Sequence, residues 1–535
     1  MIRIPRKTAI VSFAVCVLVY AALRARWIGH LLTWDEAMNL CSVRALATCS
    51  HDHFSNWFWR HPPFLSVLTL LLNPLEESFA RRVEIMCIVI GILNLGLLFA
   101  LNRKVFGTVT ALLSIYFLSV MPGSAFFDVW IKRDHTVTTF GLTALLLLVS
   151  RKPLYAGLSL GLAFLSKETA VFYAVTAVLL WFCGVPGRRK LKDLMALTIT
   201  PAATAGWWYH LESISPVSGR IESVSGFLDR IAGSFAQHAR LAVSTESGWN
   251  RPWNYYLGLL DHHLNAVGIV LAILGAATLA VQAILIRKRS KSSLSLPGHG
   301  AGKEAIGAMA SFWPLLALVP SYTILSILPS KVPWVTITLF PAWATLQAVF
   351  AGAIVGKIIS NPASLSTAGQ KILPRIGSAA AGVLVFAALF LACRLDYDRL
   401  LELTAPGQKR GAEWSLEAAQ AMNAVTRPEH RVLLTSFYYW KNILPGQACP
   451  VFAHYYRGGA EILMRPHQAA FEQLHNDLIE YDIDWALLSP LPGRHEHEIF
   501  GGFVEQLKLQ PIKLSRAWLF RTDKLARTGA EGQPE

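Results

Sequence analysis

Charged side chains are scarce in this sequence: Asp, Glu, Lys and Arg make up only 16% of its 535 residues, whereas hydrophobic residues make up 53%. The apolar residues also fall in long uninterrupted blocks, which an ordinary soluble surface does not accommodate. The composition therefore excludes a typical soluble enzyme. It predicts a polytopic α-helical membrane protein.

Other signals are missing as well. The seven cysteines imply no disulfide framework. The tail after residue 395 has neither a glycine-rich nucleotide-binding pattern nor a metal-ligand spacing. The chain shows no internal repeat of the kind typical of secondary transporters, which argues against a transporter.

Apolar segments near the length needed to cross a bilayer, about 20 residues, recur through the first three quarters of the chain. We predict spans at 8–27, 82–101, 106–123, 135–150, 194–211, 264–286, 307–328, 332–356 and 375–394, with two shorter spans inside 153–184. The total is about eleven transmembrane helices.

Lys and Arg in short loops predict the orientation. Basic clusters precede the first span and recur at alternate loops, at 103–104, 151–152, 188–190 and 287–289. We therefore expect a multi-pass protein of the cell inner (plasma) membrane with a cytoplasmic amino terminus. The loops 28–81 and 212–263 and the tail after Arg394 are then extracytoplasmic. The net charge of +15 follows from the same bias, so no nucleic-acid partner is expected.

The pattern divides the chain into two predicted domains. Residues 1–394 form the transmembrane domain, and the first outer loop carries interfacial helices around the apolar run Phe64–Leu72. In residues 395–535 the hydrophobic pattern changes to the periods of helices and strands. This pattern predicts a small extracytoplasmic (periplasmic) α/β domain. Its predicted helices cover 413–425, 467–480 and 498–507, and its predicted strands cover 431–437, 485–488 and 517–520.

A carboxylate pair, Asp35 and Glu36, follows the first span and is followed by His61 in the same loop. Charged groups at the edge of a bilayer are costly unless they face water, a partner or a substrate. The pair either marks the end of a helix or serves as a catalytic site. The titratable residues His51, His53 and His61 nearby favour the second reading.

Three outer segments carry cations that run against the inside-positive bias. They are Lys132-Arg133-Asp134, Arg251 before Pro252-Trp253, and Lys331 before Pro333-Trp334. Such residues often anchor a helix at the interface, but Arg and Lys also suit a phosphate by charge and donor geometry. In a separate apolar stretch, Lys167 and Glu168 suggest a neutralising pair at a turn.

Together these segments resemble glycosyltransferase family 39 and its relatives, which include the protein O-mannosyltransferases and the lipid A aminoarabinose transferases. The resemblance rests on the order of seven motifs over residues 8–394: Asp35-Glu36-Ala37, His61-Pro62-Pro63-Phe64, Glu77 with Arg81-Arg82, Arg133-Asp134, Gly161-Leu162-Ala163 with Ser166-Lys167, Arg251-Pro252-Trp253 with Tyr255-Tyr256, and Lys331-Val332-Pro333-Trp334 with Pro341. Relatives often have Lys where this chain has His61, and a Tyr in the span after Lys331 where it has Trp334 and Val335.

The resemblance implies the GT-C fold and an inverting hexosyl- or pentosyltransferase. Such an enzyme transfers sugar from a polyprenyl-phosphate donor to a lipid, glycan or protein acceptor on the extracytoplasmic face. Asp35 is then the general base, and Glu36 and Asp134 orient the acceptor or help to polarise the site. Arg133, Lys331, Arg251 and His61 bind the phosphate.

Two questions stay open at this level. A transporter or flippase for a lipid-linked sugar is the alternative function, and neither the sugar nor the acceptor can be named. No cofactor is certain, because Asp35, Glu36 and the histidines could hold a divalent metal ion but their spacing does not require one.

Overall fold

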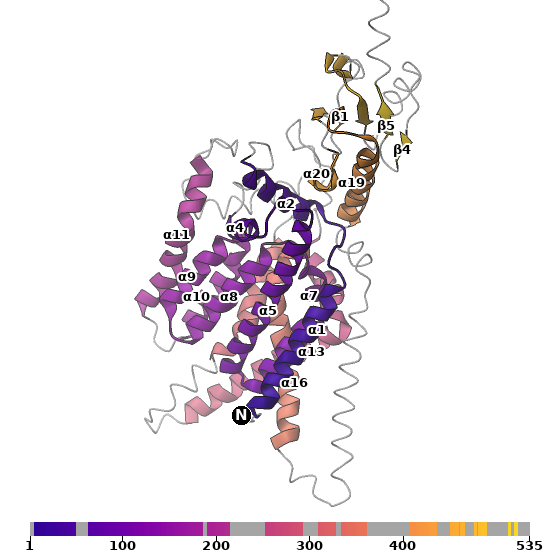
Figure 1. Cartoon of the computed structure of the whole chain (residues 1–535). Coiled ribbons are helices and arrows are strands. Elements are labelled where there is room, and N and C mark those ends of the chain that lie inside the picture. The colour runs from indigo at the N-terminus through magenta and orange to yellow at the C-terminus, as the bar shows by residue number, and fades with distance from the viewer. Residues whose placement is uncertain are drawn as a thin grey trace, which may run out of the picture. The chain divides into compact units, whose positions relative to one another are not determined.

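The computed structural model describes residues 5–49, 62–185, 190–214, 252–292, 309–327, 333–360, 406–435, 450–458, 461–465, 476–478, 480–488, 512–514 and 518–522 (Figure 1). The chain forms two compact units. Unit 1 comprises Met1–Gly29 and Phe58–Thr404, and unit 2 comprises His30–Trp57 and Ala405–Glu535. The predicted boundary at residue 395 lies close to this division, but the sequence reading left residues 30–57 with the membrane domain.

Unit 1 is helical throughout its described residues. Its elements are α1 (Arg6–Ala25), α4 (Phe64–Leu70), α5 (Phe79–Val105), α6 (Thr108–Val120), α7 (Pro122–Phe127), α8 (Asp134–Val149), α9 (Pro153–Phe164), η1 (Glu168–Ala170), α10 (Val171–Phe182), α11 (Leu191–Ile214), α13 (Tyr255–Ser292), α15 (Trp313–Ile327), η3 (Pro333–Leu339) and α16 (Phe340–Ser360).

The apolar helices of unit 1 coincide with the predicted spans. Within the part of the chain that the structure describes, four are long and apolar enough to cross a membrane: Arg6–Ala25, Phe79–Val105, Tyr255–Leu285 and Val335–Val355. Five shorter apolar helices accompany them, and the region 153–184 contains two short helices, as predicted. The predicted span 375–394 lies outside the described residues.

Proline and glycine set several helix ends in unit 1. Pro122 and Pro153 occupy the first turns of α7 and α9, where a backbone N–H is not needed. Gly107 separates α5 from α6 with a φ of 92°, a conformation that a side chain disfavours. These residues explain why the apolar blocks divide into separate helices.

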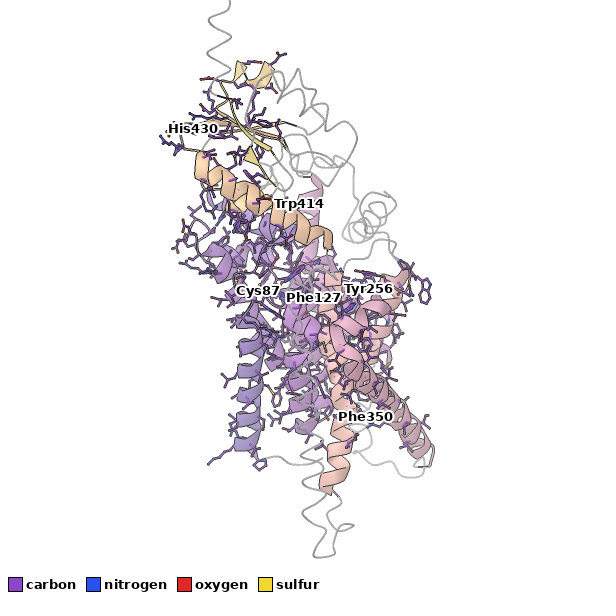
Figure 2. The ribbon with its side chains drawn as sticks, turned by 90° about the vertical axis from the view of Figure 1, so that its right-hand side faces the viewer. Cys87, Phe127, Tyr256, Phe350, Trp414 and His430 are labelled. Carbon is purple, nitrogen blue, oxygen red and sulfur yellow. The ribbon has the colours of Figure 1, made fainter. Side chains whose placement is uncertain are left out.

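Close helix packing in unit 1 depends on small residues. Helices α9 and α11 pack against each other, and a Cβ atom at Gly157 would overlap the carbonyl oxygen of Ala196. Phe127 and Tyr256, labelled in Figure 2, are buried between helices of this unit. The ring of Phe127 contacts those of His263 and Phe340, at centroid distances of 5.7 and 6.3 Å.

Helix α13 is broken at Asn265, which has a φ of 59° and a ψ of 167°. Its Oδ1 accepts the N–H of Gly268 at 2.9 Å, as the N-cap of a new helix does. Gln347 of α16 donates to the carbonyl oxygen of Gly268 at 3.1 Å. The break therefore has a defined side-chain cause within the membrane unit.

Unit 2 contains a five-stranded sheet with the order β2-β1-β3-β5-β4. Its strands are β1 (Arg431–Thr435), β2 (Glu461–Arg465), β3 (Trp485–Leu488), β4 (Ile512–Lys513) and β5 (Trp518–Arg521). Strand β1 runs parallel to β2 and β3, and β5 runs antiparallel to β3 and β4. Leu433, Ala486 and Phe520 lie side by side across β1, β3 and β5, and all three are buried.

Three helices complete unit 2: α2 (Trp34–Ala47), α19 (Pro406–Val425) and α20 (Pro450–Tyr455). Helix α20 packs against both α2 and α19. In α2, Arg44 donates from Nη1 to Nδ1 of the buried His454 at 3.2 Å. Burial, Arg44 and Arg457 lower the pKa of His454 to about 3, so its ring is neutral at pH 7.

The contact between α9 and α11 generates a packing prediction. Gly157→Ala should lower stability by about 1–3 kcal/mol, because the added methyl group must push α9 away from the backbone of α11. Gly96→Ala in α5 is the matched control, since no heavy atom lies within 4 Å of its added Cβ. Thermal unfolding of the purified protein in detergent would measure both. Equal midpoints for the two variants would contradict the close packing.

His454 generates a pH prediction. Its pKa falls from 6.5 to about 3 on folding, so its contribution to stability is complete above pH 6.5 and is lost as the pH falls towards 3. Between pH 8 and pH 5 this group alone should cost about 2 kcal/mol. The thermal midpoint of the wild type should therefore fall more than that of His454→Asn, which cannot titrate. Parallel curves for the two proteins would contradict a neutral buried His454.

Candidate functional site

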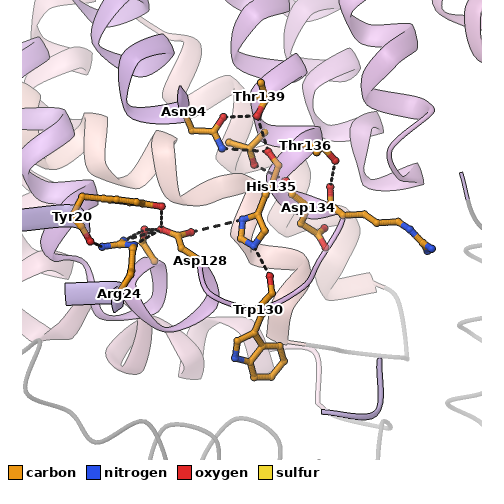
Figure 3. A network of polar contacts seen from close by, with 12 residues as sticks. Tyr20, Arg24, Asn94, Asp128, Trp130, Asp134, His135, Thr136 and Thr139 are labelled. Carbon is orange, nitrogen blue, oxygen red and sulfur yellow. Dashed lines mark hydrogen bonds and ion pairs between the residues drawn. The ribbon is translucent and has the colours of Figure 1, made fainter. Parts of the chain in front are cut away.

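A buried polar network lies in unit 1 around Arg24 of α1 (Figure 3). Arg24 donates from Nε and Nη2 to Oδ2 of Asp128 at 2.9 and 2.7 Å, and from Nη1 to the carbonyl oxygen of Ser119 at 2.9 Å. The hydroxyls of Tyr20 and Ser124 donate to the same carboxylate oxygen, each at 2.7 Å. The guanidinium and carboxylate charges therefore compensate each other inside an apolar helical unit.

The network fixes the segment between α7 and α8. Asp128 follows α7, and the side chain of His135 at the start of α8 lies with Nδ1 3.9 Å from Asp128 Oδ1. The Nε2 of His135 is 3.0 Å from the carbonyl oxygen of Trp130, and Asn94 of α5 donates to the carbonyl oxygen of His135 at 3.2 Å. Residues 128–135 are thus held at both ends by buried groups.

A small cavity adjoins this network. Its volume is about 20 Å³, which is room for about one water molecule. Tyr20, Asn94, Asp128 and His135 contribute to its lining together with Phe340 of α16. The cavity joins polar groups from α1, α5 and α8 and is too small to hold a sugar.

The predicted residues Arg133 and Asp134 lie in the segment that this network holds. Both are buried, as is the neighbouring Lys132. Asp134 accepts a hydrogen bond from Lys167 Nζ at 2.7 Å through Oδ2 and from Thr169 Oγ1 at 3.2 Å through Oδ1. The sequence reading paired Lys167 with Glu168, which is wrong: Lys167 pairs with Asp134, 33 residues away.

The predicted carboxylates Asp35 and Glu36 occupy the first turn of α2, in unit 2. Glu36 is fully buried, and its Oε2 accepts the N–H and the hydroxyl of Thr33 at 2.9 and 2.8 Å, the geometry of a capping box. Its Oε1 lies 3.0 Å from Nε2 of His30. Both oxygens of Glu36 therefore hold the start of the helix.

Asp35 differs from its neighbour in exposure. Its side chain is half-buried, whereas Glu36 is enclosed. Of the two carboxylates, Asp35 is the one that solvent reaches.

The other predicted site residues, His61, Arg251 and Lys331, lie outside the described residues. The described segments contain no group of three or more His, Cys, Asp or Glu side chains placed to hold a metal ion. The sequence reading missed Tyr20, Arg24, Asp128 and His135. Arg24 and Asp128 carried a usable signal, because charged residues inside or beside apolar helices usually have a buried partner.

Comparison with known proteins bears on the fold of the chain. A family model described as dolichyl-phosphate-mannose-protein mannosyltransferase matches residues 60–206. The matched segment includes Asp128, Arg133, Asp134 and Lys167. No curated protein sequence matches the chain.

Solved structures match over nearly the whole chain. ArnT from Cupriavidus metallidurans in the apo state gives a TM-score of 0.57 at 14% identity, covering 98% of this chain and 99% of that one. The same protein bound to undecaprenyl phosphate gives 0.54 at 15% identity, covering 97% and 98%. The Archaeoglobus fulgidus oligosaccharyltransferase tethered with an acceptor peptide gives 0.53 at 13% identity, covering 97% and 74%.

The long and short apolar helices and the near-complete coverage in both directions agree with the expected fold class. The chain has a polytopic helical membrane fold of the GT-C type, and its residues 60–206 match the family model described as dolichyl-phosphate-mannose-protein mannosyltransferase.

Proposed function

We propose that this protein is a membrane glycosyltransferase that takes a sugar from a polyprenyl-phosphate donor and transfers it to a lipid, glycan or protein acceptor outside the cytoplasm. The observation that carries the proposal is the match to ArnT, which spans almost all of both chains and includes a form bound to undecaprenyl phosphate. The family match over residues 60–206 supports the same class of reaction.

The proposed reaction is a single displacement at the anomeric carbon. The acceptor hydroxyl transfers its proton to the carboxylate of Asp35 as its oxygen bonds to that carbon. The bond from the carbon to the phosphate oxygen breaks, and the polyprenyl phosphate leaves with its negative charge. The anomeric configuration is inverted, and no general acid is needed because phosphate is already a good leaving group.

The side-chain contacts suggest different roles for the two carboxylates. Both carboxylate oxygens of Glu36 contact Thr33 or His30, so we propose that Glu36 stabilises the start of α2. Asp35 is the more exposed group, and we assign it the role of base.

The cations receive the complementary role. Arg133 is a candidate for the phosphate, because a guanidinium offers several donors to one oxyanion group. His61, Arg251 and Lys331 remain further candidates from the sequence. Asp134 is bound by Lys167 and Thr169, so we assign it to fixing the position of its neighbour Arg133.

The first test is loss of the base. Asp35→Asn should reduce turnover by about 100-fold to 10,000-fold, the usual contribution of a general base. The purified protein would be reconstituted in liposomes with a panel of polyprenyl-phosphate sugars and envelope acceptors, and donor consumption followed by mass spectrometry. Glu429→Gln, which removes an exposed carboxylate charge in the same unit, is the control and should retain full activity.

The outcome also separates the alternative function. Consumption of one donor by the wild type but not by Asp35→Asn would identify the sugar. If no donor is consumed while labelled lipid-linked sugar crosses the bilayer equally in both proteins, the chain is a transporter and the proposal is wrong.

The second test concerns the phosphate. Arg133→Gln should lower kcat/KM for the donor by roughly 10-fold to 100-fold, since it removes charge-assisted hydrogen bonds to a group that gains charge in the transition state. Arg133→Lys should retain part of this value. Arg103→Gln at the exposed end of α5 is the control. An unchanged kcat/KM in Arg133→Gln would remove Arg133 from the site.

A further inference from the structure

The helix that carries Asp35 belongs to unit 2, although it lies in sequence between two helices of unit 1. Its residues fall within His30–Trp57, which cluster with the chain after Ala405. Its partner in that unit is α20, a six-residue helix more than 400 residues later in the chain. The contacts between α20 and α2 therefore affect the position of Asp35.

Two consecutive residues of α20 contact α2 near its end and the chain just before its start. Near the beginning, the Tyr455 hydroxyl accepts the N–H of Leu32 at 3.4 Å, three residues before Asp35. Near the end, Nδ1 of His454 accepts the hydrogen bond from Arg44 at 3.2 Å. The rings of His454 and Tyr455 also meet edge to face, with centroids 4.9 Å apart.

Helix α20 is itself fixed to α19. Asn423 of α19 donates from Nδ2 to the carbonyl oxygen of Tyr455 at 3.0 Å, and its Oδ1 accepts the N–H of Arg457 at 2.6 Å. Phe452 of α20 is fully buried and stacks on Tyr456, with ring centroids 5.4 Å apart. These contacts fix the position of α20 within unit 2.

The contact at the Arg44 end has the chemistry of a directional hydrogen bond. Arginine can only donate, so Nδ1 of His454 must be the unprotonated acceptor and Nε2 carries the proton. The ring is enclosed and neutral at physiological pH, because burial and the two neighbouring arginines disfavour its charged form. Both groups therefore have a single orientation in this contact.

We infer that His454 and Tyr455 are positioning residues, which hold α2 near its end and the chain just before its start, and thereby set the position of the Asp35 carboxylate. This inference rests on the proposed function of Asp35 as base. Asp35 and Arg44 are nine residues apart, about 14 Å along a helix, so a small tilt at one end displaces the other. A displacement of about 1 Å at a reacting group can cost about 100-fold in rate.

The test compares two variants of residue 454, one that keeps a hydrogen-bond acceptor for Arg44 and one that lacks it. His454→Leu removes the acceptor, whereas in His454→Asn the amide oxygen takes the place of Nδ1. In the liposome assay we expect His454→Leu to lower kcat by about 10-fold to 100-fold with the donor KM unchanged. His454→Asn should recover most of the loss. Tyr455→Phe should also lower kcat, and Arg427→Ala, an exposed change in the same unit, should not.

Hydrogen–deuterium exchange of the full-length protein supplies a readout that does not need turnover. Amides of residues 36–47 should exchange faster in His454→Leu than in the wild type or His454→Asn. Unchanged exchange in β1 and β3 would show that the domain of the variant is folded.

The outcomes separate the two proposals. If the wild type turns over, Asp35→Asn does not, and His454→Leu retains wild-type kcat, the positioning role is wrong and the proposed function stands. Equal losses in His454→Leu and His454→Asn, or a rise in donor KM in step with the fall in kcat, would also overturn it. If the wild type consumes no donor, the proposed function fails and the positioning role with it. The exchange data then show only whether His454 holds α2.

Discussion

The arrangement of unit 1 around its polar segment depends on a buried ion pair between α1 and the end of α7. Arg24 and Asp128 are 104 residues apart, and both belong to an apolar environment where an isolated charge is very unfavourable. Removing either partner of such a pair typically costs about 3–5 kcal/mol, because the remaining charge has no compensation. The pair therefore requires α1, α7 and the segment leading to Arg133 and Asp134 to assemble together.

In unit 2 the position of α2 is constrained by a neutral buried ring and by capping contacts. The buried Glu36 carboxylate and the neutral His454 ring are each oriented by hydrogen bonds from neighbouring groups. The cationic candidate Arg133 belongs to unit 1, and the proposed base Asp35 belongs to unit 2.

Sequence reasoning predicted the helices of unit 1 well, because long apolar blocks are a strong signal. In unit 2 it predicted β1, β3 and β5, which are buried and central, and missed β2 and β4, the two edge strands. Edge strands are short or charged at their ends, so their sequences show little alternation of polar and apolar residues. It proposed Asp35, Arg133 and Asp134 as site residues because of their unusual charge, and these stay predictions. It missed the partners of Asp134 and Arg24, because ion pairs between distant helices leave no local pattern.

The capping box Thr33-Trp34-Asp35-Glu36 explains the buried Glu36. The attachment of α2 to α20 was not visible, since 410 residues separate Arg44 from His454. This separation also has a consequence for biosynthesis. At about 5–20 residues per second, α2 leaves the ribosome about 20 s to about 80 s before its partner exists. During that interval α2 has no α20 to pack against, so this contact within unit 2 can form only after residues 450–455 have been made.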